Sequence, residues 1–466
     1  MRSLYRLAIV AALPLLGACA VTPLEQAAAG VARSAGAEPD WNTTRAAAAP
    51  PERALDPESA VVLAFARNPE IRRQYALLGI AQSELEDAAR IANPRLGLAW
   101  ADPNAAGPER RTQSLTASFA ELLLLPSQRR LSQSAFRQVE LQVVHALAML
   151  SRDVEIAWHD QLAAAQRATL AAQAADAAGT AEQLAGRYRE AGNITDLQLQ
   201  EVRRRAAAAR IAALRARAAA DAARARLADL LGLRTADAWR TTEHVAPAPA
   251  QPLSAPVAAA AALEQRRDHA AAREAVAMRE DALRTTRRWR WLGLFEAGFE
   301  RERDTDGSTL KGPAFVLELP LFDQHQGAVA RAKARLIEAQ ARRDALALSI
   351  ENEISAAASR LESTRRIALE HGESLLPAAA ETVRRRSERV NYMLDGVFTL
   401  LAAKEEEYEA RAAWLESLRD YWSARAALRA AAGGALPGDD QLPEATIGAE
   451  EEAPAGDGHA HHGEGP

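Results

Sequence analysis

The chain has a single cysteine, and its position suits a covalent modification. Cys19 follows an apolar stretch at residues 7–16 and the small residues Gly17 and Ala18. A positively charged start, a short apolar core and small residues before a cysteine form a lipobox, where a bacterial signal peptidase cuts and the cysteine is lipidated. We expect residues 1–18 to be removed and Cys19 to carry a lipid anchor. A chance cysteine is the alternative, and a single cysteine excludes an intramolecular disulfide in either case.

Three histidines near the C-terminus form the second candidate chemical site. His459, His461 and His462 lie within four residues of one another, in an acidic segment rich in glycine and proline. Imidazole binds copper, zinc and nickel, and three ligands on a segment without regular structure would hold such an ion only loosely. The alternative is a tail without a chemical role.

Other arrangements that carry chemistry are missing from the sequence. There is no Gly-rich phosphate-binding loop, no His-Glu-x-x-His motif and no nucleophile with a base at a plausible spacing. The formal net charge is −5, and basic residues are interleaved with acidic ones, which argues against a nucleic-acid-binding patch. We therefore expect no enzymatic activity, and no cofactor apart from the lipid and a loosely held transition metal.

The chain contains two copies of one pattern, about 200 residues apart. Each copy has a helical opening, two short stretches in which apolar residues alternate with small or polar ones, and a long helical run broken once. Aromatic residues are only 5% of the chain and alanine is abundant, so we expect thin, closely packed helices. The predicted division is a signal peptide (1–18), a lipidated tether (19–57), a first repeat (58–234), a linker (235–257), a second repeat (258–434) and an acidic, His-containing tail (435–466).

The periodicity of apolar residues, together with the glycines and prolines that interrupt regular structure, predicts the individual elements. They are a helix at 56–91, strands at 96–100 and 115–119, a helical hairpin at 127–232 that turns at 188–193, strands at 291–299 and 314–319 around a polar loop at 301–312, and a second long helical run broken at 391–396.

The predicted strands are about long enough to cross a bilayer when tilted. Four strands cannot close a barrel, however, and lipid does not tolerate open strand edges. If the strands span a membrane, several chains must share one barrel, and three chains would supply twelve strands. The alternative is an ordinary helical bundle.

The order, duplication and spacing of these segments resemble the TolC-type outer-membrane efflux factors over about residues 56–434. The motifs that carry the resemblance are Asn68-Pro69-Glu70-Ile71 in the first helical opening, Asn93-Pro94-Arg95-Leu96 before a strand, Leu317-Glu318-Leu319-Pro320-Leu321-Phe322-Asp323 after the last strand, and Arg187-Tyr188-Arg189-Glu190-Ala191-Gly192-Asn193-Ile194-Thr195-Asp196-Leu197 at the hairpin turn.

The resemblance implies a mainly α fold with a small β part, built from a duplicated helix–strand–strand–long helical hairpin unit. It implies a homotrimer in which a periplasmic α-barrel continues into a shared twelve-stranded transmembrane β-barrel in the outer membrane. The implied partners are a periplasmic adaptor, or membrane fusion protein, and an inner-membrane pump. The chain would then be the channel of a tripartite efflux system for small toxic solutes. Some lipidated members of the family serve metal pumps, so copper, zinc, cobalt or cadmium ions are the favoured cargo.

The resemblance also assigns the two hairpin turns, or tips, to contact with the adaptor. At the second tip, the repeat alignment places Leu394 where the family often has glycine, with Gly396 two residues later. The apolar residues Val397 and Phe398 either dock the adaptor or pack inside the hairpin. The candidate tip residues are Tyr188, Gly192, Ile194, Thr195, Leu197, Leu394, Gly396, Val397 and Phe398. The candidate residues of a channel constriction near the tips are Gln198, Glu201 and Leu400.

Two other functional interpretations stay open at this point. A periplasmic coiled-coil lipoprotein or adaptor would form no pore, although adaptors usually have one hairpin within β-rich domains and two hairpins are predicted here. A conduit for protein secretion has the same design as an efflux channel. Ala20 after the cysteine favours an outer-membrane location, because an aspartate at that position usually signals retention in the inner membrane.

Overall fold

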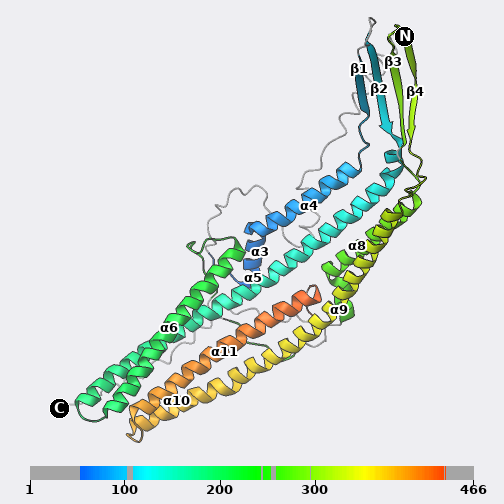
Figure 1. Cartoon of the computed structure of the whole chain (residues 1–466). Helices are drawn as coiled ribbons and strands as arrows, with labels where there is room; N and C mark the ends of the chain where they lie inside the picture. Colours follow the sequence, from blue (N-terminus) through cyan, green and yellow to red (C-terminus); the bar gives the residue numbers. More distant parts are fainter. Residues whose placement is uncertain are drawn as a thin grey trace, which may run out of the picture.

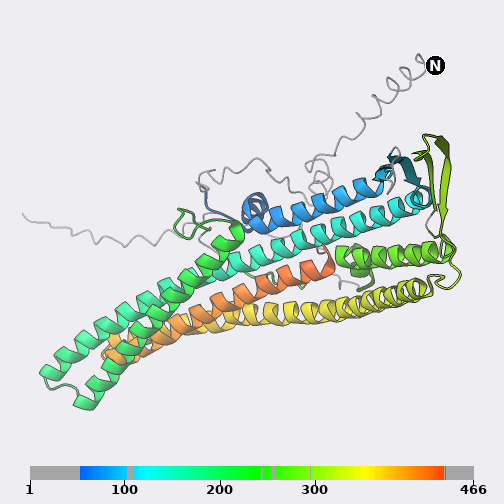
Figure 2. The ribbon, with the colours of Figure 1, turned by 45° about the horizontal axis from the view of Figure 1, so that its top comes forward.

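The chain forms a long rod with a small β-sheet at one end and two helical tips at the other (Figure 1, Figure 2). The computed structural model describes residues 53–101, 109–242, 245–252, 259–293, 295–434 and 436. The signal peptide, Cys19, most of the tether and the histidines His459, His461 and His462 lie outside the described residues.

The first half of the chain opens with two helices instead of the single predicted one. α3 (Pro57–Arg67) and α4 (Pro69–Ala88) meet at Asn68. Pro69 disfavours a helical backbone at the residue before it, and the Asn68 side chain caps α4 by accepting a backbone N–H bond of 2.7 Å. The prediction of one helix over residues 56–91 was wrong for this reason.

A very long helical hairpin follows the first two strands. α5 (Phe119–Glu190) has 72 residues, which corresponds to about 110 Å. α6 (Asp196–Leu231) returns beside it (Figure 1). α5 begins at Phe119 and not at the predicted residue 127, because the Ser118 hydroxyl caps it and Pro126 is accommodated within the helix.

The second half has the same order of elements, with an irregularity in its outgoing helix. Its helices are α7 (Ala259–Gln265), α8 (Arg267–Arg288), α9 (Gln326–Glu370), the π-helical turn η2 (His371–Leu375), α10 (Leu376–Asn391) and α11 (Val397–Ala432). Gly372 lies where the helix widens, and a Cβ at this residue would be only 3.0 Å from the indole nitrogen of Trp414. A larger residue at this turn would therefore displace the tryptophan.

The four strands form one antiparallel sheet in the order β1-β2-β3-β4. The strands are β1 (Arg95–Ala101), β2 (Arg110–Ser118), β3 (Phe295–Arg303) and β4 (Thr309–Leu317). The pairing of β2 with β3 joins the two halves of the chain. β3 and β4 extend into the polar loop predicted at 301–312, so that the turn is confined to 304–308. The polar residues of that segment keep the strand alternation and pair across the sheet, which is why the loop prediction was wrong.

The core is a thin strip along the helices. In the first half it surrounds Trp158 of α5, whose indole N–H donates to the Leu55 carbonyl at 2.9 Å. In the second half, Trp422 of α11 donates in the same way to the Ala246 carbonyl at 2.8 Å. Buried alanines between α5 and α6, including Ala185 of α5, let the two helices approach closely. In the described part of the chain, no helix is long and apolar enough to cross a membrane.

In each half, a polar side chain between the two opening helices donates a hydrogen bond to a carbonyl near the end of the returning helix, α6 or α11. In the first half, the Asn68 amide donates to the carbonyl of Leu230 in α6 at 2.8 Å. At the matching position of the second half, buried Arg266 occupies the N-cap position of α8 without capping it, and its side chain donates to the Ala431 carbonyl of α11 at 3.3 Å. We call these contacts the Asn68 joint and the Arg266 joint.

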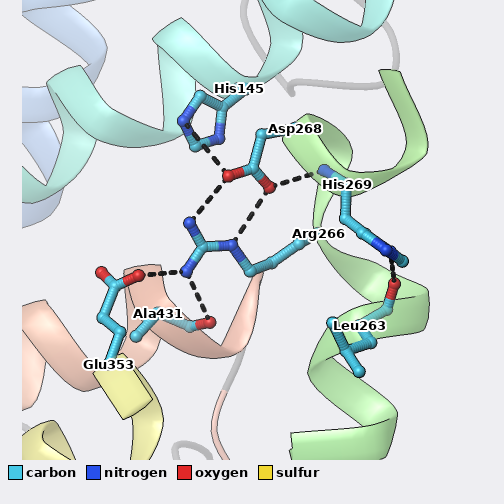
Figure 3. A network of polar contacts seen from close by, with 7 residues as sticks. All are labelled: His145, Leu263, Arg266, Asp268, His269, Glu353 and Ala431. Atoms are coloured by element: carbon cyan, nitrogen blue, oxygen red, sulfur yellow. Dashed lines mark hydrogen bonds and ion pairs between the residues drawn. The ribbon is translucent and has the colours of Figure 1, made fainter. Parts of the chain in front are cut away.

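The Arg266 joint has a charged network that the Asn68 joint lacks (Figure 3). Arg266 donates two hydrogen bonds to Asp268, of 3.1 and 2.8 Å, and one of 2.6 Å to Glu353 of α9. His145 of α5 lies 3.9 Å from the Asp268 carboxylate. Burial raises the pKa of Asp268, but the hydrogen bonds and charge of Arg266, together with His145 and the His269 amide, outweigh burial, and the pKa lies below its ordinary value. The network therefore joins α8, α9 and α11 and meets α5 at His145, whose pKa burial lowers.

Candidate functional site

The two faces of the sheet differ in chemistry. The register places Leu96, Leu115 and Phe299 side by side on one face, and every second residue of each strand shares that face. We call it the apolar face. Its large apolar residues, all exposed, are Leu96, Leu98, Trp100, Leu115, Phe299, Phe315 and Leu317.

The opposite face of the sheet consists mostly of small and polar residues, apart from exposed Leu310 and Val316 of β4. Its residues include Gly97, Ser114, Thr116, Gly298, Glu300 and Gly312. Two ion pairs cross between strands on this face, one from Arg95 to Glu296 and one from Arg110 to Glu302. We call it the polar face. One apolar and one polar face are the requirements for a wall between lipid and water.

The junction between sheet and helices, which we call the neck (residues 289–293 and 318–323), is also rich in exposed apolar groups. Phe322 is 94% exposed, and Trp291 is exposed as well. The guanidinium of Arg290 lies 4.5 Å from the centre of the Trp291 ring. Aromatic rings with polar partners are typical of a bilayer–water interface.

The first tip, at the far end of the rod from the sheet, is a tight turn built around Gly192. Gly192 has a φ angle of 76°, a left-handed conformation that glycine adopts without steric cost. The Asn193 amide donates to the Tyr188 carbonyl at 2.8 Å and the Gly192 amide donates to the Arg189 carbonyl at 3.0 Å. These two hydrogen bonds form the Schellman motif that ends a helix, so Gly192 has a structural role in the turn.

The residues after this turn cap α6. The Gln198 amide donates to the Thr195 hydroxyl at 3.2 Å, and the Gln198 side chain accepts from the Thr195 amide at 2.8 Å. Arg189 donates two hydrogen bonds, of 2.6 and 2.9 Å, to Asp196. Gln198 therefore has a local capping role. Its role in a constriction stays a prediction, as do those of exposed Glu201 and half-buried Leu400.

The second tip has the same backbone turn with a different residue at its centre. The two Schellman bonds recur, at 2.8 Å from the Leu394 amide and 2.9 Å from the Met393 amide. Met393 has a φ angle of 58°, so Met393, not Leu394, stands where Gly192 stands in the first tip. The repeat alignment was wrong by one residue. Gly396 has a φ angle of −78° at the N-cap of α11, where glycine is not required.

The second tip exposes a compact apolar surface. Tyr392 is 77% exposed, Met393 is 93% exposed, and Leu394 is exposed beside them. Tyr392 and Met393 were missing from the predicted site residues, although three consecutive large apolar residues at a turn were a signal for them. Hydrogen bonds from Arg389 and then Arg386 lower the pKa of neighbouring Asp395 to about 2, so this carboxylate stays ionised.

An aromatic contact joins the two tips. The rings of Tyr188 and Phe398 meet edge to face, with centroids 6.0 Å apart. Phe398 and Val397 are half-buried, which favours packing over docking for both residues. Phe398 packs against the other hairpin, however, and not only inside its own. Of the remaining first-tip candidates, Ile194 is half-buried, whereas Thr195 and Leu197 are exposed.

Several solved structures have the same architecture, although no protein-family model and no curated protein matches this chain. The outer-membrane channel OprN is 18% identical with a TM-score of 0.67, over 86% of this chain and 97% of that one. The outer membrane protein VceC of Vibrio cholerae is 18% identical with a TM-score of 0.65, over 81% and 96%. The outer membrane channel CmeC of Campylobacter jejuni is 15% identical with a TM-score of 0.69, over 82% and 86%. The chain thus has the fold of outer-membrane channels, which is the fold that its resemblance to the TolC-type efflux factors predicts.

Proposed function

We propose that this chain is one subunit of a bacterial outer-membrane efflux channel. The observation that carries the proposal is the sheet, which has an exposed apolar face, a polar face with its own ion pairs, and two outer edges. Such a sheet is stable in lipid only if its edges are paired. The solved structures of similar fold, OprN, VceC and CmeC, are outer-membrane proteins, which supports this location.

Three copies of the chain would pair all the edges. Within the described residues, β1 and β4 are the outermost strands of a four-stranded sheet. Pairing β4 of each copy with β1 of the next closes a ring of twelve strands from three such sheets. The helices also offer apolar contacts to a neighbouring copy. Exposed residues suited to this role are Ile211 and Leu214 on α6 and Ile337, Leu348 and Ile367 on α9.

The tips would receive the partners of the channel. Exposed Tyr392, Met393 and Leu394 form an apolar surface at the end of the rod opposite the sheet, where a periplasmic adaptor and an inner-membrane pump would approach. The contact between Tyr188 and Phe398 would hold the two hairpins of each subunit in register at that end. Gln198 and Glu201 lie in the first turns of α6 and Leu400 lies in the first turn of α11, and these residues would form a constriction.

The N-terminal lipid and the cargo extend the proposal. Cys19 would carry the lipid, which mass spectrometry of the N-terminal peptide tests directly. His459, His461 and His462 would collect copper, zinc, cobalt or cadmium ions for export. Removal of residues 458–466 should then lower metal tolerance. Wild-type tolerance together with unchanged metal binding would show that the tail has no such role.

Spin labels along β2 test the membrane wall itself. One nitroxide label at a time is placed at residues 111–118 of a Cys19→Ser chain in lipid vesicles. We expect labels at 113, 115 and 117 to collide with oxygen dissolved in lipid, and labels at 112, 114, 116 and 118 to collide with a water-soluble nickel complex. Uniform access to the nickel complex would contradict the proposal and favour a lipoprotein that forms no pore.

A further inference from the structure

The apolar face becomes basic at the end of the sheet farthest from the helices. Arg111 of β2 is the direct partner of Arg303 of β3, and Arg301 of β3 is the direct partner of Lys311 of β4. These four exposed cations occupy two adjacent rows across three strands, next to the β3–β4 turn at residues 304–308.

Two directly opposed like-charge pairs are unfavourable in a sheet. Arg111 has a carboxylate partner, because it donates to Glu109 at 2.9 Å. Within the described parts of the chain, Arg301, Arg303 and Lys311 form no ion pair. The glutamates of β3 lie on the polar face, where Glu296 and Glu302 already pair with arginines. The cations of the polar face are thus neutralised within the chain, whereas Arg301, Arg303 and Lys311 of the apolar face are free to bind an external anion.

The position of these cations fits a lipid headgroup. Phe299 belongs to the apolar rows and Arg303 lies four residues further along β3, about 13 Å in an extended strand. Trp100 shares the row of Arg111 and Arg303, and tryptophan is enriched where bilayer meets water. Acyl chains would cover the apolar rows, and headgroups would reach the basic ones.

We propose that this basic end of the apolar face binds a phosphorylated glycolipid of the outer leaflet. The inference rests on the proposed function, because it needs the apolar face to lie in the outer membrane. The arginine guanidinium donates two parallel hydrogen bonds to a phosphate, which suits the chemistry. Two opposed pairs of cations match a headgroup with more than one phosphate better than a phospholipid with a single one.

The amount of lipid that binds to the purified full-length protein tests the site. Native mass spectrometry measures the binding of lipid A, a diphosphorylated glycolipid, and of phosphatidylglycerol to the wild type and to Arg301→Gln/Arg303→Gln. Arg331→Gln/Arg335→Gln on α9 is the matched control with the same loss of charge. We expect the wild type and the control to prefer lipid A, and the sheet variant to bind it about tenfold more weakly, or about 1.4 kcal/mol.

Two further measurements make each outcome decisive. Arg301→Lys/Arg303→Lys keeps the charges but not the paired donors, and should bind lipid A more tightly than the glutamine variant and more weakly than the wild type, which separates lost charge from a damaged sheet. Lipid A binding that is unchanged in the glutamine variant overturns the inference, and equal wild-type affinity for both lipids overturns the glycolipid assignment. Planar-bilayer conductance of the same samples separates the two proposals. A wild type that never conducts contradicts the channel, whereas conducting samples with unchanged lipid A binding contradict only the glycolipid site.

Discussion

The two halves of the chain fasten the same helix junction with different chemistry. The Asn68 joint uses a neutral amide that caps α4 and reaches one carbonyl of α6. The Arg266 joint uses a buried guanidinium that reaches a carbonyl of α11 and two carboxylates, one of them on α9. A neutral joint holds two elements together, whereas the charged joint ties α8, α9 and α11. A duplicated backbone can thus keep its geometry while one copy becomes more dependent on a single residue.

The two tips also share one backbone turn and differ in the residue at its centre. The Schellman hydrogen bonds are alike, but the first tip places Gly192 at its left-handed position and the second places Met393 there. The first tip is thus relaxed, whereas the second has a strained residue with an exposed side chain. Under the proposed function, this strained turn with exposed apolar residues would be a surface that serves a contact and not stability.

Removal of the joint residues should give the largest difference between the halves. Arg266→Ala should lower the free energy of unfolding by about 3 kcal/mol, because Asp268 loses its partner in a partly buried site. Asn68→Ala should lower it by about 1 kcal/mol, the usual value of a helix cap. Urea unfolding followed by circular dichroism measures both. Equal losses in the two variants would contradict the contrast between the joints.

Acid should weaken the contact between the halves. His159 of α5 stacks on Trp422 of α11, and burial lowers the pKa of His159 to about 3. The unfolded chain therefore takes up a proton below about pH 6.5 that the folded chain does not bind. The contribution of His159 to the free energy of unfolding should fall by up to about 1.4 kcal/mol per pH unit from there down to about pH 3. His159→Phe keeps an aromatic ring and should reduce this slope. The same slope in both proteins would contradict the assignment.

Substitutions of the central residues of the two tips should change the free energy of unfolding in opposite directions. Gly192→Ala should lower the free energy of unfolding by about 1 kcal/mol, because a Cβ is unfavourable at a φ of 76°. Met393→Gly should raise it by about 0.5 kcal/mol, since relief of strain is partly offset by the freedom of glycine in the unfolded chain. Urea unfolding compares the two variants. A loss of stability in Met393→Gly would show that the second turn is unstrained.

The N-caps after the tips should show the smallest difference. Thr195 caps α6 with its side chain, whereas Gly396 at the N-cap of α11 has none to offer. Gly396→Ser should therefore raise the free energy of unfolding by about 0.3 kcal/mol. Thr195→Ala is the matching loss, expected at about 1 kcal/mol. A lower free energy of unfolding in Gly396→Ser would contradict the expectation that a side-chain cap stabilises α11 at this position.

The sequence predicted the elements that depend on local pattern, and missed those that depend on distant contacts. Alternation at Leu96, Leu98 and Trp100 predicted a strand with one apolar face. The polar residues Arg301 to Arg303 looked like a loop, because they form a strand only through pairing with β2 and β4.

The candidate site was predictable to a similar extent. Gly192 was recognised from its residue type at a helix break. Met393 was not, because methionine seldom adopts a left-handed backbone and only the hydrogen bonds of the folded turn impose it. The break at Asn68 had a local signal in Pro69, but apolar periodicity continues across it and favoured one helix.

Single-channel recording on purified protein in planar bilayers, with its mass fixed by light scattering, tests the central claim most directly. The account predicts a trimer that conducts in small steps through a narrow tip, and larger steps when Tyr188→Ala removes the contact between the hairpins. A monomer or dimer that never conducts, with or without that substitution, would contradict the channel and with it the assignment of the sheet to a membrane wall.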